Sequence, residues 1–280
     1  MVKHKKIVRR PIIGLLLIIA FAIAINVYLN FKPAFTGAAI NFYQNYIPQD
    51  IRSEYPSSFG AFEDQREYRI DPKMTLIDLQ NGKTDILTQV LATPEISSPL
   101  DSGSSFLWNF SDHRKVADIV WNQTWGDDSK DWSIFSMYFI ADCQDHLDGF
   151  SIGNFEYFKP TNSQEGNGYS DRSVLLNPLY GIVDTGSGTS YPRPLFGWMK
   201  IELESLKVTA DDALHIAEEN GGRKARLSVN NQCTIFLNYS PNYKFNVWHV
   251  SISHNNELPN IFEINIDPYT AKYKIIETGK

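Results

Sequence analysis

The stretch PIIGLLLIIAFAIAINVYLNF, residues 11–31, is the most apolar part of the chain, and the interpretation of the rest depends on it. Its first fifteen residues carry no polar side chain. At about 1.5 Å of rise per residue, a helix formed by the whole stretch 11–31 reaches about 30 Å, the thickness of the hydrocarbon core of a bilayer. The sequence therefore predicts a transmembrane anchor over residues 11–31, with membrane lipid as its partner.

The residues that precede this run are basic. Residues 1–10 contain five Lys or Arg side chains and no acid. Positive charge beside an apolar span stays on the cytoplasmic side, so we expect a cytoplasmic tail at residues 1–10 and the C-terminus outside the cell. A cleaved signal peptide has the same basic start, and residues 22–24, Ala-Ile-Ala, would supply its cleavage pattern.

The chain beyond the tail is acidic. Without residues 1–10 it has 21 basic against 32 acidic side chains, a net charge of −11. A surface with this charge repels polyanions, which argues against nucleic acid as a partner. About 250 residues follow the anchor, enough for one large domain or two ordinary ones.

Five segments are expected along the chain: the tail, the anchor, a stalk, a β-rich region and a C-terminal module. The stalk covers residues 32–67, the β-rich region 68–194 and the module 195–280. The predicted fold class is α+β, with one N-terminal transmembrane helix and then a β-rich ectodomain. This ectodomain ends in a module with a helix on an antiparallel sheet.

Aromatic and β-branched residues dominate the β-rich region and predict strands there. Residues 75–79 and 85–91 are expected to pair through a hairpin turn at Asn81-Gly82. An antiparallel meander is expected over residues 106–110, 116–124 and 133–141.

The C-terminal module carries a clear helix start. Thr209-Ala-Asp-Asp212 is a capping box with Asp in place of Glu, and Gly221-Gly222 is expected to end the helix. Strands are expected at residues 233–239, 245–253, 261–267 and 272–276.

Three stretches of this module resemble a PepSY-type domain. They are VTADDALHIA at 208–217, Trp248-His-Val250, and IDPYTA at 266–271, where Ala271 takes the place of the family's glycine. The resemblance covers residues 201–280. PepSY-like modules inhibit or regulate proteases or act as binding modules. The resemblance therefore implies a bacterial, extracytoplasmic, non-catalytic role and transfers no catalytic residue.

One stretch matches a catalytic pattern. Ile182-Val-Asp184-Thr-Gly186 has the two apolar residues before Asp-Thr-Gly that aspartic proteases show. That chemistry needs two carboxylates that share a proton, and the chain has no second Asp-Thr-Gly. Asp184 is thus the candidate catalytic residue of an alternative hydrolase. The other interpretation is a glycine-rich turn in which Asp184 caps a backbone amide.

The candidate metal ligands are Asp142, Asp145 and Asp148, which precede Gly149. Carboxylates in a turn bind calcium, but the calcium loop of helix–loop–helix proteins places its first ligands at alternate positions and here they come every third. A solvated acidic turn is the alternative. The histidines show no zinc-binding spacing, so neither a metal nor a cofactor is expected.

The two cysteines are Cys143 and Cys233, both beyond the anchor. An oxidising compartment permits a disulfide between them, and two separate buried thiols are the alternative. The six tryptophans indicate a packed β-structure, with carbohydrate binding on exposed rings as the functional alternative.

These observations predict a single-pass membrane protein whose extracytoplasmic part binds or regulates another extracytoplasmic protein. The sequence favours a non-catalytic role. The alternatives are a hydrolase of unrecognised type that uses Asp184, and a protein that binds cell-wall glycan through its tryptophans.

Overall fold

The computed structural model describes residues 64–89, 107–126, 131–144, 148–163, 166–190, 200–241, 246–254 and 260–276. These residues belong to one of the two compact units into which the chain divides, Ser57–Pro192 with Trp198–Lys280. The other unit, Met1–Pro56 with Arg193–Gly197, lies outside the described residues.

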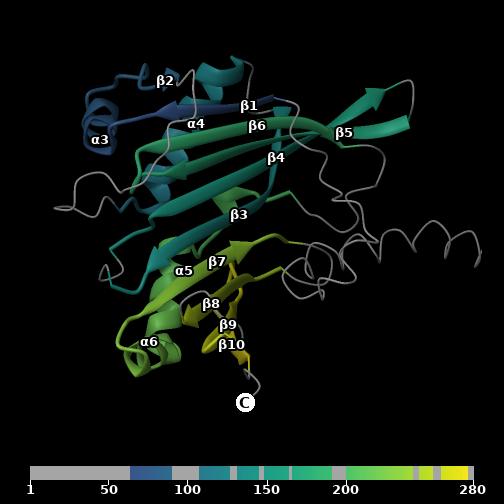
Figure 1. The fold of residues 1–280 in the computed structure, drawn as a ribbon. Helices are drawn as coiled ribbons and strands as arrows, with labels where there is room; N and C mark the ends of the chain where they lie inside the picture. Colours follow the sequence, from purple (N-terminus) through teal and green to yellow (C-terminus); the bar gives the residue numbers. More distant parts are fainter. Residues whose placement is uncertain are drawn as a thin grey trace, which may run out of the picture. The chain divides into compact units, whose positions relative to one another are not determined.

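A ten-stranded sheet runs through the described part of the chain (Figure 1). Its strand order is β10-β9-β8-β7-β3-β4-β5-β6-β1-β2, and every pairing is antiparallel. The strands are β1 (Asp64–Arg69), β2 (Thr88–Gln89), β3 (Ser133–Asp142), β4 (Ile152–Ser163), β5 (Gly166–Asn177), β6 (Ile182–Ser190), β7 (Cys233–Tyr239), β8 (Trp248–His254), β9 (Phe262–Ile266) and β10 (Tyr273–Ile276).

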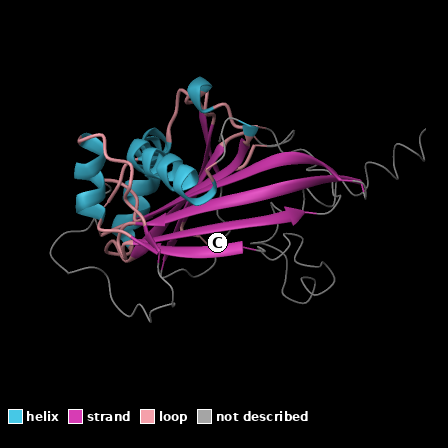
Figure 2. Cartoon of the chain, turned by 90° about the horizontal axis from the view of Figure 1, so that it is seen from above, coloured by secondary structure: helices cyan, strands magenta, loops and turns pink. Residues whose placement is uncertain are grey.

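The helices lie on one side of the strands (Figure 2). They are α3 (Pro72–Gln80), α4 (Phe110–Trp125), α5 (Ala210–Ala217) and α6 (Arg223–Ser228), with a 3-10 turn at Leu203–Ser205 and a π-helical turn at Glu218–Gly222. Helix α4 packs on β4 and β5, and α5 packs on β7 and β8. Two helices therefore cover two halves of the same sheet.

The core lies between these helices and the sheet. Phe110 at the start of α4 packs against Phe139 of β3, with ring centroids 5.6 Å apart, and Trp121 packs against Tyr157 of β4 at 4.6 Å. Trp248 of β8 is fully buried, and its Nε1 donates to the carbonyl of Val208, which precedes α5. Full burial of such side chains stabilises the fold by roughly 1.5 to 3 kcal/mol each.

The expected α+β fold is wrong, because the described chain is mainly β and its C-terminal strands do not form a separate sheet. Strand β7 pairs with β3, from Met137 opposite Tyr239 to Asp142 opposite Thr234. Strand β3 has two edges whose N–H and C=O groups need partners, and β4 satisfies one of them. The C-terminal strands β7 to β10 satisfy the other edge, so they extend the same sheet.

The described residues do not test the predicted transmembrane helix. Among the described residues, no helix is both long and apolar enough to cross a membrane. The predicted anchor at residues 11–31 lies outside those residues, as does nearly all of the predicted stalk.

Residues 116–124 were expected to form a strand and instead lie within α4. Asn109 accepts a hydrogen bond from the backbone N–H of Asp112 and so caps the helix, and Gly126, with φ of 69°, ends it. Its buried residues recur at helical spacing; they are His113, Val116, Ala117, Val120 and Trp121. Burial of this stripe outweighs the strand preference of its β-branched and aromatic residues.

The hairpin expected at residues 75–91 is wrong for a similar reason. Asp71 accepts from the backbone N–H groups of Lys73 and Met74, and Pro72 occupies the first position of α3. Both features start helices. Asn81 and Gly82, the expected hairpin turn, instead end α3, with Gly82 in the left-handed region.

The C-terminal expectations are confirmed in outline. The capping box at Thr209 is present in both directions, and strands occupy each of the four expected places. As expected, the helical backbone is interrupted at Gly221, which has φ of 125°. A second helix, α6, follows directly after this kink.

The turn between β9 and β10 has an unusual backbone at Ala271. Asp267 accepts from the backbone N–H groups of Tyr269 and Thr270, and the N–H of Ala271 donates to the carbonyl of Asp267. This turn holds Ala271 at φ of 59°, where a Cβ is unfavourable.

We expect Ala271→Gly to raise the free energy of unfolding by about 0.5 to 1 kcal/mol. Relief of the Cβ strain outweighs the extra freedom that glycine has in the unfolded chain. Urea denaturation measures this change. The control is Ala225→Gly in α6, which is expected to destabilise by about 1 kcal/mol. A loss of stability in Ala271→Gly would contradict the prediction.

A fully buried histidine lies between α4 and the sheet. His113 packs against Trp108, Phe139 and Phe150, and its Nε2 donates to the carbonyl of Phe150 at 3.2 Å. A Cβ on Gly153 of β4 would lie only 2.6 Å from the Nδ1 of His113, so this close approach requires glycine. Burial lowers the pKa of His113 from 6.5 to about 4, because the charged ring would lose its hydration.

His113 is therefore expected to make stability depend on pH. In the unfolded chain His113 binds a proton below pH 6.5, whereas in the folded chain it does so only below about pH 4. The stabilisation is therefore complete above pH 6.5 and is lost as the pH falls. Between about pH 7 and about pH 5, the wild type should lose about 2 kcal/mol more than His113→Gln. Urea denaturation at both pH values measures this difference. His249→Gln, at a half-buried position on β8, is the control. Equal pH dependence in wild type and His113→Gln would refute the assignment.

Candidate functional site

Polar side chains form a row across the face of the sheet that the helices leave uncovered. Residues opposite each other on neighbouring strands share a face. Tyr138 of β3 lies opposite Asn154 of β4, Asn154 opposite Leu175 of β5, and Leu175 opposite Asp184 of β6. Asp184 in turn lies opposite Glu67 of β1. We call these five residues the central row.

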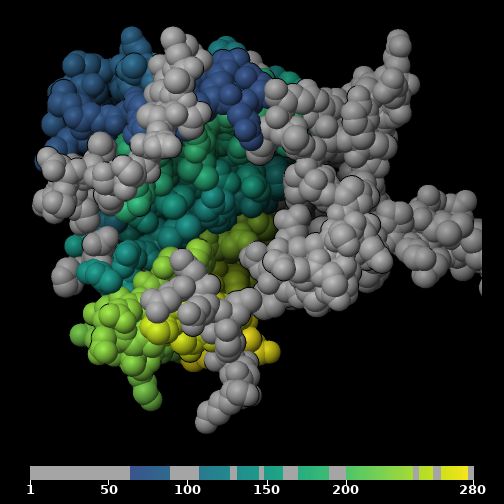
Figure 3. Space-filling model, in the orientation of Figure 1, coloured from purple at the N-terminus to yellow at the C-terminus, as the bar shows by residue number. Residues whose placement is uncertain are grey.

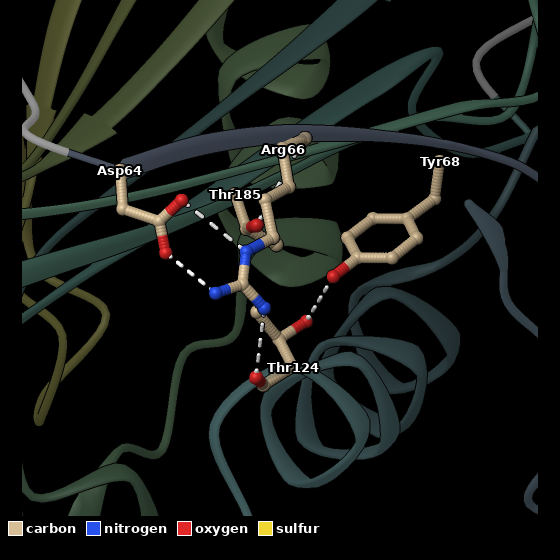
Figure 4. Close-up of polar contacts among 5 residues, drawn as sticks. All are labelled: Asp64, Arg66, Tyr68, Thr124 and Thr185. Carbon is tan, nitrogen blue, oxygen red and sulfur yellow. Dashed lines mark hydrogen bonds and ion pairs between the residues drawn. The ribbon is translucent and has the colours of Figure 1, made fainter. Parts of the chain in front are cut away.

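Glu67 points to this face because its neighbours point to the other one. Arg66 and Tyr68 reach the end of α4, where Arg66 donates to the carbonyl of Thr124 at 3.3 Å and the hydroxyl of Thr124 donates to that of Tyr68 at 3.2 Å (Figure 4). Asp64 accepts two hydrogen bonds from the Arg66 guanidinium, at 2.7 and 3.2 Å. These contacts fix β1 against α4, and strand alternation then places Glu67 on the opposite side.

Two further acids lie on the same face. Glu156 lies opposite Ser136 and Ser173, one row away from the central row, and Asp171 lies one row further along β5. We call Glu67, Glu156, Asp171 and Asp184 the acidic face. Asp184 is exposed, the other three are half-buried, and Figure 3 shows strands β3 to β6 at the surface on this side.

The electrostatics of this face favour a visiting positive charge. Partial burial and then the charge of Glu67 raise the pKa of Asp184. Burial raises the pKa of Glu156, which the charge of Asp171 raises further and a hydrogen bond from Ser136 lowers. Burial, with the charges of Glu156 and Asp184, raises the pKa of Tyr138 to about 12. Neighbouring carboxylates thus destabilise the charged forms of Asp184 and Glu156, and a cation nearby would reverse that effect.

Two buried acceptors in the central row have no hydrogen-bond partner among the residues that the structure describes. They are Oδ1 of Asn154, whose side chain is only 4% exposed, and Oε1 of Glu67. The amide nitrogen of Asn154 donates to Glu156 at 3.5 Å. Arg69, a cation on the same face of β1, donates instead to the carbonyl of Tyr180. A buried acceptor without a donor costs free energy, so a ligand that brings N–H groups would be favoured.

The sequence singled out Asp184 and missed Glu67, Asn154 and Glu156. A signal for the last two exists, because polar Asn154 and Glu156 alternate with apolar Phe155 and Tyr157. Asp184 and Glu67 are two adjacent carboxylates, but Asp184 lines neither of the cavities described below. Asp184 is exposed and Glu67 is half-buried, and such a carboxylate pair at a sheet surface can bind a cation.

The structure describes two of the three candidate metal ligands, Asp142 and Asp148. Oδ1 of Asp142 accepts from the backbone N–H of Gln144 at 2.8 Å, Asp145 lies outside the described residues, and Asp148 lines a cavity beside α5 and α6. Within the described ranges, no three His, Cys, Asp or Glu side chains are placed to hold a metal ion.

The cavity beside α5 and α6 has a volume of about 930 Å³. In its walls Arg226 forms an ion pair with Glu218 at 2.8 Å, His215 contacts Glu219 at 3.0 Å, and Arg223 and Lys224 add two further cations. A second cavity, of about 350 Å³, lies between α3 and the chain that leads to β2.

The tryptophans that the structure describes serve packing. Trp108, Trp121 and Trp248 are fully buried, and Trp132 is 8% exposed. The guanidinium of Arg172 lies 4.8, 4.7 and 4.2 Å from the rings of Trp121, Trp125 and Trp132 (in that order). The guanidinium of Arg172 therefore makes favourable cation–π contacts with all three rings.

Comparison with family models, with curated proteins and with solved structures gives no match. The proposals below therefore depend on the residues of this chain alone.

A disulfide joins β3 to β7 where the two halves of the sheet meet. Cys143 follows β3 and Cys233 begins β7; their Cα atoms are 5.3 Å apart and both side chains are buried. The backbone N–H of Cys143 also donates to the carbonyl of Cys233. The bond closes a loop of 90 residues, so it strongly restricts the unfolded chain.

We expect reduction of this disulfide to lower the free energy of unfolding by about 2 to 5 kcal/mol. Urea denaturation with and without dithiothreitol measures the loss. The double variant Cys143→Ala with Cys233→Ala should start at the lower stability and not respond to the reductant. Equal stability of the oxidised and reduced wild type would refute a structural role for the bond.

Proposed function

We propose that this chain is a non-catalytic binding protein whose acidic face binds a positively charged segment of another protein. The observation that carries this proposal is the central row, where Asp184 and Glu67 lie side by side with unpaired acceptors on a face that no described helix covers. Carboxylates are acceptor-only groups when ionised, so their natural ligands are ammonium and guanidinium groups.

We further propose that the protein acts outside the cell while residues 11–31 hold it at the membrane. The support is the apolar run with its basic flank, together with a disulfide, which forms in oxidising compartments. The overall negative charge of the chain beyond the tail would also attract a basic partner.

The resemblance of residues 201–280 to PepSY-type domains supports a regulatory role for this binding. In this proposal the partner is an extracytoplasmic protein, with a protease as one class. The resemblance rests on the sequence stretches themselves, among them the capped helix start at Thr209.

The test is titration of the full-length chain, in a neutral detergent, with octaarginine and with octaglutamate. Octaarginine should bind, with an affinity that falls as salt is added, and octaglutamate should not. Asp184→Asn and Glu67→Gln should each weaken octaarginine binding about tenfold, because each removes one charge-assisted partner.

Glu219→Gln is the matched control, since it removes one exposed carboxylate from the π-helical turn between α5 and α6, away from the acidic face. Its affinity for octaarginine should equal that of the wild type. If both peptides bind equally, or if Glu219→Gln weakens binding as much as Asp184→Asn does, the acidic face is not the binding site.

A further inference from the structure

The central row has an apolar floor between its acceptors. Leu175 of β5 is half-buried and lies between Asn154 of β4 and Asp184 of β6. Neighbouring strands are about 4.8 Å apart, so the backbones at Asn154 and Asp184 are separated by about 10 Å. Their side chains thus face each other across a leucine, with Glu67 beside Asp184.

We infer that this part of the row, Asn154, Leu175, Asp184 and Glu67, is a slot for an arginine side chain and selects arginine over lysine. The inference rests on the proposed function, since it names the side chain that the acidic face takes from its partner.

The acceptors fit a guanidinium better than an ammonium. A guanidinium offers five N–H donors in one plane, so it can donate to Asp184 and Glu67 on one side and to Asn154 on the other, with hydrogen bonds of about 2.9 Å. A lysine ammonium is compact and reaches only one end of such a slot.

The unpaired acceptors supply an independent reason. Oδ1 of Asn154 belongs to a side chain only 4% exposed and has no donor, and Oε1 of Glu67 is also unpartnered. These two atoms lie at opposite ends of the slot. A ligand that offered only a positive charge would interact with the carboxylates and would leave Asn154 without a donor. A planar group with donors on both edges can donate to Asn154 on one side of Leu175 and to the carboxylate pair on the other.

The apolar floor of the central row gives a second reason to expect arginine rather than lysine. Arginine is weakly hydrated and lies flat on apolar or aromatic surfaces, whereas lysine keeps its hydration shell. Leu175 and the half-buried ring of Tyr138 provide such surfaces in the row. Arg69 does not compete for the slot because it donates to the carbonyl of Tyr180.

The experiment compares octaarginine, octalysine and an octaarginine whose side chains are symmetrically dimethylated, each titrated into the full-length chain in a neutral detergent. Octaarginine should bind at least about tenfold more tightly than octalysine. Dimethylation keeps the charge but blocks the donors, so the dimethylated peptide should bind about as weakly as octalysine.

Asn154→Leu should lower octaarginine binding to about the level of octalysine, because the slot then keeps its carboxylates but loses the amide acceptor. Asn238→Leu is the matched control, because Asn238 is an exposed residue of β7 on the same face outside the slot. If Asn154→Leu does not fold, the affinities of the wild type for the three peptides still test whether the slot selects arginine. Equal binding of octaarginine and octalysine overturns the slot but leaves the proposed function intact. Failure of both cationic peptides to bind overturns both.

Discussion

The fold depends on one pairing, that of β3 with β7. Strand β3 carries the N-terminal strands on one edge and the C-terminal strands on the other, so the two parts of the chain share a sheet and a core. The same pairing aligns the helices above it. The carboxylate of Asp211 in α5 accepts from the backbone N–H of Phe110 at the start of α4, at 3.0 Å. The separation of the strands would therefore also separate the helices.

Local signals in the sequence predicted the C-terminal elements well. The capping box at Thr209 depends only on neighbouring residues, and strands β7 to β9 have apolar residues at alternate positions. Helix α4 was missed because Val116, Val120 and Trp121 prefer strands when composition alone is considered. Its cap at Asn109 was present in the sequence, but the β-branched and aromatic residues that follow it led to the prediction of a strand.

The global arrangement could not be derived from such signals. Which strand pairs with β3 depends on contacts between residues far apart in sequence, and no local pattern encodes them. The same holds for the site. Asp184 was noticed because of its motif, but its neighbour Glu67 is set by the register between β1 and β6. A single-residue shift in that register would turn Glu67 to the core side and remove the carboxylate pair.

The contact between Gly153 and His113 has a consequence for how this protein can evolve. The two residues share one small volume, in which a Cβ at 153 has no room while the imidazole is present. A larger residue at 153 becomes acceptable only if the residue at 113 becomes smaller first, so a change at 153 depends on an earlier change at 113. In divergent descendants of this chain, the two positions are expected to change together.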